Sequence, residues 1–585
     1  MDESQLSRRK LLGVTTGAGV ALAGGLMLHG EHAGRALAQD EVAGAATPVA
    51  MGDPLPEEFG TETNWPVENL DVRATRDVQG TSISADTVDQ LGEAWAFPVA
   101  APGSFGALTA HPTVVGDMVY LQDAAANVYA INKETGEQAW ANMYNDVVPS
   151  GGPNGIAAAY GLLFTTIGGL ADVVALKPDT GEEVWRTNIK GSLNEGITTS
   201  PLVYDSVVYV STIPGSSEAF YGGGQRGVIH AIDAATGGVL WYFDTTTDNL
   251  WGNPRVNSGG GFWHPPTADE DGKIYFPIAN PAPYPGTEEF PFASSRQGDN
   301  LYTDSVLKMD PATATLDWYT QVRQGDVWDL DNQLSPVLAD VDGKKLAFAS
   351  GKHGVAYALD RDTGEIVWRT PVGTHKNDEL TYEDLKDRDP NEAIEVMPGT
   401  LGGVETPMAF SADKNLLILP VYELASTYIG SGFDPNTPFD FTSATGFLVA
   451  LNATDGSVVW QTELASGPLA GATITNDIVW SSGLDGAVQA FSLEDGSEVF
   501  TYQTTAGVNA PLAVSGDYVF IPAGGPLIPS SATSDPAPTA ALQLIAIKIG
   551  GTGLATPEGE APASDATPTL EDTGNDPGTN ATPTS

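Results

Sequence analysis

The 585-residue sequence contains no cysteine, few basic residues and, beyond its amino-terminal segment, no apolar run of membrane-spanning length. The lack of cysteine excludes disulfides, cysteine-ligated zinc, iron–sulfur clusters and a CxxCH haem attachment. With 26 Lys+Arg against 75 Asp+Glu, the formal charge of −49 argues against nucleic acid or another polyanion as a partner. The hydrophobic fraction of 41% is nevertheless ample for a large core.

The amino terminus reads as an export signal. The pair Arg8-Arg9 precedes an uncharged, Gly/Ala-rich stretch that reaches Met27, and Ala36-Leu37-Ala38 supplies a small-x-small cleavage step. This pattern predicts a twin-arginine signal over residues 1–38 and a periplasmic or extracellular location. The alternative, an amino-terminal membrane anchor, is disfavoured because the core is short and only weakly apolar. No cysteine follows the signal, which excludes a bacterial lipoprotein.

Two further segments lack the apolar content needed to pack. Residues 39–64 and residues 551–585 each carry six acidic residues and no basic one. They predict an acidic disordered linker and a disordered Thr/Pro-rich tail. The intervening residues 65–550 hold 60 acidic and 22 basic residues, a net charge of −38, so the acidity belongs mostly to the folded part.

A tryptophan-containing phrase recurs through residues 65–550. In its fullest form, A-x-D-x-x-T-G-x-x-x-W, two β-type runs flank a glycine-containing turn, which predicts a hairpin. Eight copies, spaced by 40 to 92 residues, end at Trp95, Trp140, Trp185, Trp241, Trp318, Trp368, Trp460 and Phe500. Periods above 40 residues with about four strands each predict an all-β, eight-bladed propeller. The repeated tryptophans are expected to pack between blades.

The first copy is only half a repeat. Residues 91–95 have no preceding partner strand, and residues 542–547 near the other end supply the missing β-type run. We therefore expect the last blade to take strands from both ends of the chain. The long spacings 241–318 and 368–460 exceed what four strands need and predict loop insertions that build a binding face.

The repeat phrase resembles that of the pyrroloquinoline quinone (PQQ) dehydrogenases, the quinoprotein alcohol dehydrogenases, over nearly all of residues 85–550. Scaffold propellers of the outer-membrane assembly type share the phrase, so the loops between repeats discriminate better. Residues 279–283 and 298–305 resemble the family's G-N-P-x-P…G-D-N-L-Y-T-D-S, which implies that Asn280 is a metal ligand. Without the second match, an ordinary Asn-Pro turn would be the simpler interpretation.

The segment Asp326-Val327-Trp328-Asp329-Leu330-Asp331 is similar to the family's D-x-W-D-x-D. The resemblance implies that Asp329 is the catalytic base and a metal ligand, and that Asp331 adds the carboxylate of the lanthanide-using branch. Glu218, in a loop longer than the family's pattern, is the remaining candidate ligand. For residues 326–331, an acidic solvated loop is the alternative interpretation. Carboxylate and amide oxygens suit Ca²⁺ or a lanthanide ion.

The resemblance also implies three cofactor contacts. In Gly259-Gly260-Gly261-Phe262-Trp263, Trp263 matches the tryptophan that stacks under the quinone ring. In residues 197–201, Thr198 matches the threonine that bonds a PQQ carboxylate. In residues 351–354, Lys352 matches the base that polarises the reactive carbonyl and so also takes part in catalysis. A surface lysine is the alternative for Lys352.

Three features depart from the family pattern. The vicinal cysteine pair that covers the other quinone face is absent, and the region reads Ser150-Gly151-Gly152-Pro153-Asn154. Gly155 stands where an arginine usually follows that Asn. The G-G-x-N-W segment is Gly402-Gly403-Val404-Glu405-Thr406, without its Asn and Trp. The base and metal set is therefore retained while part of the cofactor cage is rewritten.

These residues together predict an exported dehydrogenase that oxidises an alcohol to an aldehyde or ketone with PQQ and Ca²⁺ or a lanthanide ion. Because the chain has no haem motif, its electrons are expected to pass to an external acceptor such as a cytochrome c or a cupredoxin. Two alternatives stay open. One is a non-catalytic extracytoplasmic scaffold; the other is a dehydrogenase of a polymer such as polyvinyl alcohol, with long loops at 285–297 and 373–400 lining an open groove.

Overall fold

The computed structural model describes most of the predicted propeller and little of either end. The described residues are 43–44 (backbone only), 63–101, 105–147, 152–192, 195–214, 221–441, 444–526 and 541–553. The predicted signal, nearly all of the acidic linker and tail, and Glu218 lie outside them. No helix within these ranges is long and apolar enough to cross a membrane.

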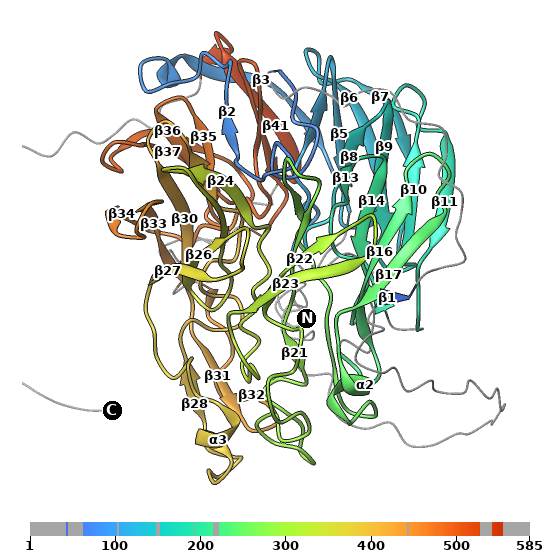
Figure 1. Ribbon diagram of the computed structural model, residues 1–585. Coiled ribbons are helices and arrows are strands. Elements are labelled where there is room, and N and C mark those ends of the chain that lie inside the picture. Colours follow the sequence, from blue (N-terminus) through green and yellow to red (C-terminus); the bar gives the residue numbers. More distant parts are fainter. Residues whose placement is uncertain are drawn as a thin grey trace, which may run out of the picture.

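Eight antiparallel sheets with four main strands each surround one axis (Figure 1). The first four comprise β4 (Thr113–Val115), β5 (Met118–Gln122), β6 (Val128–Asn132), β7 (Gln138–Asn142); β8 (Ala157–Ala159), β9 (Leu162–Ile167), β10 (Asp172–Leu176), β11 (Glu183–Asn188); β13 (Leu202–Tyr204), β14 (Val207–Ser211), β16 (Arg226–Asp233), β17 (Val239–Asp244); and β19 (Thr267–Ala268), β20 (Ile274–Pro277), β22 (Ser305–Asp310), β23 (Thr315–Gln321). The all-β propeller expected from the repeats is confirmed.

The other four sheets follow the same order from the axis outward. They comprise β24 (Val337–Val341), β25 (Lys344–Ala349), β26 (Val355–Asp360), β27 (Ile366–Pro371); β29 (Ala409–Ser411), β30 (Leu416–Glu423), β33 (Thr445–Asn452), β34 (Val458–Leu464); β35 (Thr473–Thr475), β36 (Ile478–Ser482), β37 (Ala487–Ser492), β38 (Glu498–Gln503); and β39 (Ala513–Ser515), β40 (Tyr518–Ala523), β41 (Gln543–Ile549), β3 (Leu91–Pro98). The first strands of neighbouring blades contact one another around the axis.

The last blade contains strands from both ends of the described chain. Strand β3 pairs antiparallel with β41, with Trp95 opposite Ala546 and Phe97 opposite Leu544. A short strand, β42 (Thr552–Gly553), adds to the free edge of β3. A 3₁₀ turn, η1 (Val88–Gln90), leads into β3.

The repeated tryptophans join each blade to the next. Each indole Nε1 donates to a backbone carbonyl in the following blade, for example Trp140 to Pro178 at 2.9 Å and Trp368 to Ala453 at 3.0 Å. Except in the fourth blade, whose turn has Ala314 at this position, the ring lies on the turn glycine of that blade. A Cβ on Gly456 would come within 2.6 Å of Trp368. That glycine also has φ = 73°, which favours glycine sterically. The predicted packing role of the tryptophans is confirmed.

The segment from Thr63 to Val78 winds around the axis at one end of the ring. Its backbone bonds the innermost strands one after another, including Trp65 to Val114, Val72 to Ala268 and Arg73 to Leu338. It ends as β2 (Asp77–Val78), which pairs in parallel with β35. The buried guanidinium of Arg76 donates to Ala472 O, Glu68 O, Leu512 O and Thr473 Oγ1.

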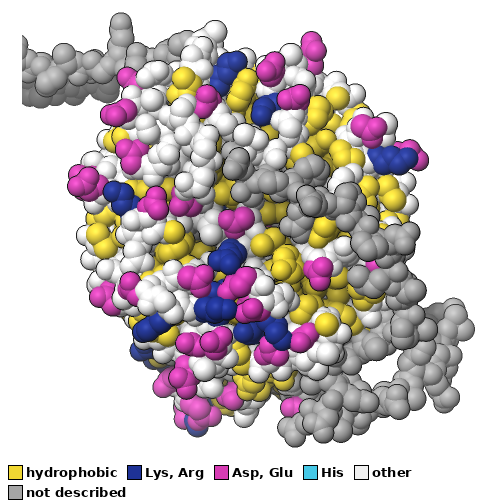
Figure 2. All heavy atoms as spheres, turned by 45° about the horizontal axis from the view of Figure 1, so that its top comes forward, with side chains coloured by type: hydrophobic (Ala, Val, Ile, Leu, Met, Phe, Trp, Pro, Cys, Tyr) yellow, Lys and Arg dark blue, Asp and Glu magenta, His cyan; other side chains and the backbone are white. Residues whose placement is uncertain are grey.

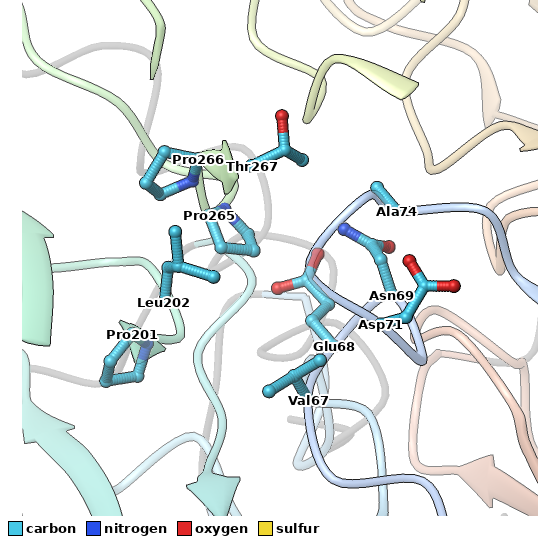
Figure 3. Close-up of a pocket in the computed structure, with 10 residues that line it drawn as sticks. All are labelled: Val67, Glu68, Asn69, Asp71, Ala74, Pro201, Leu202, Pro265, Pro266 and Thr267. Atoms are coloured by element: carbon cyan, nitrogen blue, oxygen red, sulfur yellow. The ribbon is translucent and has the colours of Figure 1, made fainter. Parts of the chain in front are cut away.

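Buried polar groups fix this segment to the third and fourth blades. Glu68 accepts a hydrogen bond from Ser200 Oγ at 2.7 Å and lies 2.8 Å from His264 Nδ1. Figure 3 shows residues 67–74 facing residues 201–202 and 265–267 across a cavity of about 10 Å³, room for one water. Burial raises the pKa of Glu68, but His264 outweighs it and holds that pKa below its usual value. On this side of the molecule acidic side chains outnumber basic ones, and the two are interspersed (Figure 2).

The two long repeat spacings contain extra elements, as predicted. Between Trp241 and Trp318 lie α2 (Asp248–Trp251), β18 (Ser258–Gly260) and β21 (Pro281–Ala282). Between Trp368 and Trp460 lie α3 (Tyr382–Leu385) and the small sheet of β28 (Ile394–Val396), β31 (Ser426–Ile429) and β32 (Gly432–Phe433). Figure 1 shows α2, α3, β21 and this sheet at the end of the ring opposite β2. The remaining short strands are β1 (Ala43–Gly44), beside β17, and the pair β12 (Glu195–Gly196) and β15 (Ile213–Pro214).

The turn glycines make a test of the packing between blades. We expect Gly456→Ala to lower the free energy of unfolding by about 1–3 kcal/mol, because the new methyl group meets Trp368 and the backbone is left-handed. Ala314, in the corresponding turn of the fourth blade, already has φ = 54°. Ala314→Gly should therefore cause no loss. Urea unfolding followed by tryptophan fluorescence measures both; equal stability of Gly456→Ala and the wild type would contradict the packing argument.

Candidate active site

A tight acidic loop places Asp329 and Asp331 at the end of the ring that carries the insertions. The buried carboxylate of Asp326 accepts hydrogen bonds from the amides of Trp328, at 3.2 Å, and Leu330, at 2.9 Å. These bonds clamp the residue between them, Asp329, in a left-handed conformation with φ = 69°. Such a conformation is costly for a non-glycine residue and persists only when its surroundings impose it.

Neighbouring segments hold this loop from outside. Arg323 Nε lies 2.5 Å from Asp326 Oδ1, and the Tyr428 hydroxyl donates to Trp328 O at 2.7 Å. Apolar side chains from both insertions, including Phe292 and Leu385, pack around Trp328. The predicted base therefore sits on a loop whose shape is fixed by an ion pair and by a core of its own.

Asp329, Asp331 and Lys352 form one buried cluster. Lys352 Nζ lies 2.7 Å from Asp331 Oδ2 and 3.2 Å from Asp329 Oδ2. The hydroxyl of Thr400 also donates to Asp329 Oδ2. Gly351 allows the approach, because a Cβ there would lie 2.0 Å from the carbonyl oxygen of Asp331.

Asn280 joins the cluster through Asp331. Its backbone amide donates to Asp331 Oδ1 at 2.6 Å, and its side-chain oxygen accepts from the Tyr221 hydroxyl at 3.3 Å. Asn280 is fully buried. Three of the four predicted metal ligands, Asn280, Asp329 and Asp331, are thus brought together, while the fourth, Glu218, lies outside the described residues.

Burial and the shared ammonium control the electrostatics. Burial raises the pKa of Asp329 to about 8, although the Lys352 ammonium acts to lower it. Burial lowers the pKa of Lys352, but the carboxylates of Asp329 and Asp331 outweigh this and hold it well above its usual value. With a pKa of about 8, the Asp329 carboxyl is largely protonated at neutral pH, and a cation bound beside it would favour its ionised form.

Polar atoms without partners support the same conclusion. Within the described residues, Asp329 Oδ1 has no hydrogen-bond donor, and neither carboxylate oxygen of the fully buried Asp304 has one. Burial raises the pKa of Asp304 well above its usual value, and Asp326 and Asp331 add to the shift. The described residues contain no group of three acidic or histidine side chains placed to hold an ion alone. The oxygen ligands available to a metal ion are therefore two carboxylates and one amide oxygen. They fit a hard cation that takes its remaining ligands from other groups.

Aromatic side chains surround the cluster. The ammonium of Lys352 lies 5.2 Å from the centroid of the Trp263 ring. The two residues predicted to contact the quinone, Trp263 and Lys352, therefore lie at one site. Tyr221 and Tyr284 form a perpendicular pair with centroids 5.3 Å apart. Burial, with Asp329 and Asp331 nearby, raises the pKa of both tyrosines well above its usual value. A flat ring system with polar edges suits a floor of this kind.

Thr198 is the remaining residue predicted to contact the cofactor, and three segments depart from the family pattern. Thr198 is half-buried, and a Cβ on Gly152 would lie 3.3 Å from it. The loop with Ser150 and Gly151 lies outside the described residues. Glu405 accepts from Gln333 Nε2 at 3.4 Å, and Gln333 Oε1 accepts from the amide of Lys352. Burial raises the pKa of Glu405 to about 8 against the lowering effect of Lys352.

Sequence reasoning missed several residues of this site. Thr400, Tyr221, Tyr284 and Asp304 contact or face the predicted residues but come from the insertions or from loops without a repeated pattern. Asp304 and Tyr221 belong to stretches used for the resemblance, residues 298–305 and the Glu218 loop, but neither was singled out.

Comparison with known protein families identifies the same region of the chain. The profile described as "Glucose/ethanol/alcohol dehydrogenase, beta-propeller domain" matches residues 65–151 and 190–390. The profile described as "Outer membrane protein assembly factor BamB" matches residues 435–533. The first match contains Asn280, Asp329, Asp331 and Lys352.

Curated relatives extend over most of the chain. The quinoprotein alcohol dehydrogenase PedH of Pseudomonas putida is 26% identical over 80% of this chain and 86% of its own. The quinohemoprotein alcohol dehydrogenase of Comamonas testosteroni is also 26% identical, over 80% and 73%. A polyvinylalcohol dehydrogenase of a Pseudomonas species is 25% identical over 78% and 70%.

Solved structures show the same fold. The crystal structure of the Comamonas testosteroni quinohemoprotein alcohol dehydrogenase superposes with a TM-score of 0.70 at 22% identity, covering 84% of this chain and 81% of that one. A europium-containing methanol dehydrogenase gives 0.66 at 20% identity, covering 83% and 98%.

The ion pair between Arg323 and Asp326 allows a test of what stabilises the acidic loop. We expect Asp326→Asn to lower the free energy of unfolding by about 3 kcal/mol, because it leaves Arg323 without its buried counter-charge. Glu383→Gln, which removes the partner of Lys386 in an exposed pair, should change stability little. Urea unfolding compares the two variants. Equal effects would show that the Asp326 pair is not what secures the loop.

Proposed function

Because this chain belongs to the PQQ-dependent, or quinoprotein, alcohol dehydrogenase family, we propose that it is an exported enzyme that oxidises an alcohol to an aldehyde or ketone. PQQ and Ca²⁺ or a lanthanide ion are its proposed cofactors. The observation that carries the proposal is the buried cluster of Asp329, Asp331 and Lys352 beside Asn280 and Trp263. When bound, PQQ supplies the two-electron acceptor and the ion polarises it.

The proposed base is Asp329. Thr400 and Lys352 hold its Oδ2 atom, while Oδ1 has no donor among the described residues. Oδ1 is thus the atom in position to take the hydroxyl proton of an alcohol as general base. The left-handed loop and the Asp326 clamp fix its direction, which limits the reorganisation needed at reaction.

The other residues hold the cofactors in this proposal. Asn280, Asp329 and Asp331, with Glu218, supply the oxygen ligands of the ion, and Asp331 adds the charge that a trivalent ion favours. Trp263 provides the floor for the quinone, and Thr198 bonds one of its carboxylates. Lys352 would hold the quinone by a hydrogen bond from its ammonium, whose positive charge would favour the reduced cofactor.

Location and acceptor follow from the sequence. The predicted twin-arginine signal supports export to the periplasm or the cell exterior. With no cysteine for a haem attachment, the electrons are proposed to leave to an external cytochrome c or cupredoxin. The strong negative charge would attract a basic carrier. A purely structural scaffold is disfavoured, because a scaffold needs no buried base–ammonium pair at an aromatic floor.

Turnover tests the proposal. We expect protein reconstituted with PQQ and Ca²⁺ or La³⁺ to reduce an artificial dye with a primary alcohol. Asp329→Asn should lower kcat at least about a hundredfold, because an amide cannot accept the proton. Asp362→Asn, in an exposed turn, is the matched control. Quenching of tryptophan fluorescence by PQQ reports cofactor binding in each variant. PQQ binding without oxidation of any alcohol in a broad panel would favour the scaffold.

The choice of ion tests Asp331. Asp331→Asn keeps an oxygen ligand but removes one negative charge, so it should weaken binding of a trivalent ion at least about tenfold and that of Ca²⁺ less. Tb³⁺ luminescence sensitised by tryptophan measures the first, and competition by Ca²⁺ measures the second. Unchanged Tb³⁺ affinity would remove Asp331 from the proposed ligand set.

A further inference from the structure

A groove of about 460 Å³ lies outside the catalytic cluster. Its lining includes Thr247, Asp248, Trp251, Gln297, Asp299 and Leu301. None of Asp329, Lys352 or Trp263 lines it. Its size falls within the range of ligand-binding clefts, and it opens to solvent at the end of the ring that carries α2 and the insertions (Figure 1).

One wall of the groove is a strained turn. Asp248, Asn249, Leu250 and Trp251 have φ between 49° and 56°, so α2 is a left-handed turn of four non-glycine residues. Each such residue costs about 1–2 kcal/mol. Only Leu250 is buried, and the turn holds the other three side chains at the surface. A run of four such residues persists only because the surrounding bonds impose it.

Specific bonds hold the turn in this conformation. The Leu301 carbonyl accepts from Trp251 Nε1 at 2.9 Å and from Thr247 N at 3.1 Å. Asn249 Oδ1 accepts from Arg226 at 2.6 Å, and Asn257 Nδ2 donates to Leu250 O at 2.9 Å. The half-buried Trp251 ring is thus fixed at its edge.

The same walls lead to the catalytic cluster. Ser258, next to Asn257, donates to Tyr221 O, and the Tyr221 hydroxyl donates to Asn280. On the other side, Asp304, three residues beyond Leu301, donates its amide to Ala279 O at 3.2 Å. Asp304 also lies close enough to Asp331 for that carboxylate to raise its pKa, so the segment from Leu301 to Asp304 joins the groove to the catalytic cluster.

The chemistry of the lining defines the ligand. The exposed carboxylates of Asp248 and Asp299 have no hydrogen-bond donor among the described residues, and Gln297 adds an amide. The described lining contains no lysine or arginine, which disfavours an anion. Carboxylates that accept hydrogen bonds from hydroxyls, beside an indole that packs on carbon–hydrogen surface, suit a neutral polyhydroxylated chain.

We infer that this groove is an accessory subsite that binds a second part of a polymeric secondary alcohol while another hydroxyl of the same chain is oxidised. The inference rests on the proposed function. The sequence predicted that loops 285–297 and 373–400 would line the groove for a polymer. Of these, only Gln297 lines the present groove.

Two measurements separate this subsite from the catalytic proposal. Calorimetric titration of the full chain with polyvinyl alcohol measures binding without turnover. We expect Trp251→Ala and Asp299→Asn to weaken that binding about tenfold, with Tyr242→Ala, an exposed tyrosine on β17, as the matched control. With reconstituted enzyme, Trp251→Ala should raise the KM for the polymer about tenfold and leave kcat/KM for 1-butanol unchanged.

The outcomes are distinguishable. No binding of the polymer by the wild type, or equal binding by Trp251→Ala, overturns the subsite whether or not alcohols are oxidised. Tighter binding of dextran than of polyvinyl alcohol overturns it in favour of a sugar site. Absence of turnover with retained, Trp251-dependent polymer binding counts against the catalytic proposal alone.

Discussion

The contact between each repeated tryptophan and the next blade is the interaction on which the rest of the structure depends. The indole bonds a carbonyl beside the neighbouring turn and covers its glycine, so both the spacing and the rotation of successive sheets are fixed at one point. A propeller blade has no covalent tie to its neighbours except the chain itself, and this protein has no disulfide. This repeated contact sets the ring on which the loops of the site are built.

The catalytic cluster shows a second level of organisation. Asp329 and Asp331 face a single ammonium, and neither side-chain oxygen of the buried Asp304 has a hydrogen-bond partner among the described residues. In a structural ion pair, the groups would balance one another. Here Asp329 Oδ1 and both side-chain oxygens of Asp304 lack partners among the described residues, while Arg323, the Asp326 clamp and the insertion core hold the loop in shape. The stability of the surrounding structure thus supports a site in which some buried carboxyl oxygens have no partner.

The sequence predicted the repeat well because each tryptophan and turn glycine has a local pattern. The strand pairing between residues 91–98 and 543–549 followed from the same pattern, since a half repeat must find its partner. The grouping of Asn280, Asp329, Asp331 and Lys352 came from the family resemblance. Thr400 and Tyr284 were not predictable, because they lie in insertions that have no repeated pattern. Tyr221 lies in the loop before β16, which was used only to identify Glu218. The left-handed turn at 248–251 was not predictable either, since none of its four residues is a glycine.

The axial segment from Thr63 to Val78 has a consequence for the order of assembly. It is made before any blade, yet its hydrogen-bonding partners span the ring, and Arg76 bonds Leu512, 436 residues later in the chain. The segment therefore reaches its final place only after the last blade has been synthesised. Contacts of such sequence separation slow folding. Residues 63–78 can therefore form all of their hydrogen bonds only when the inner strands of the ring have folded.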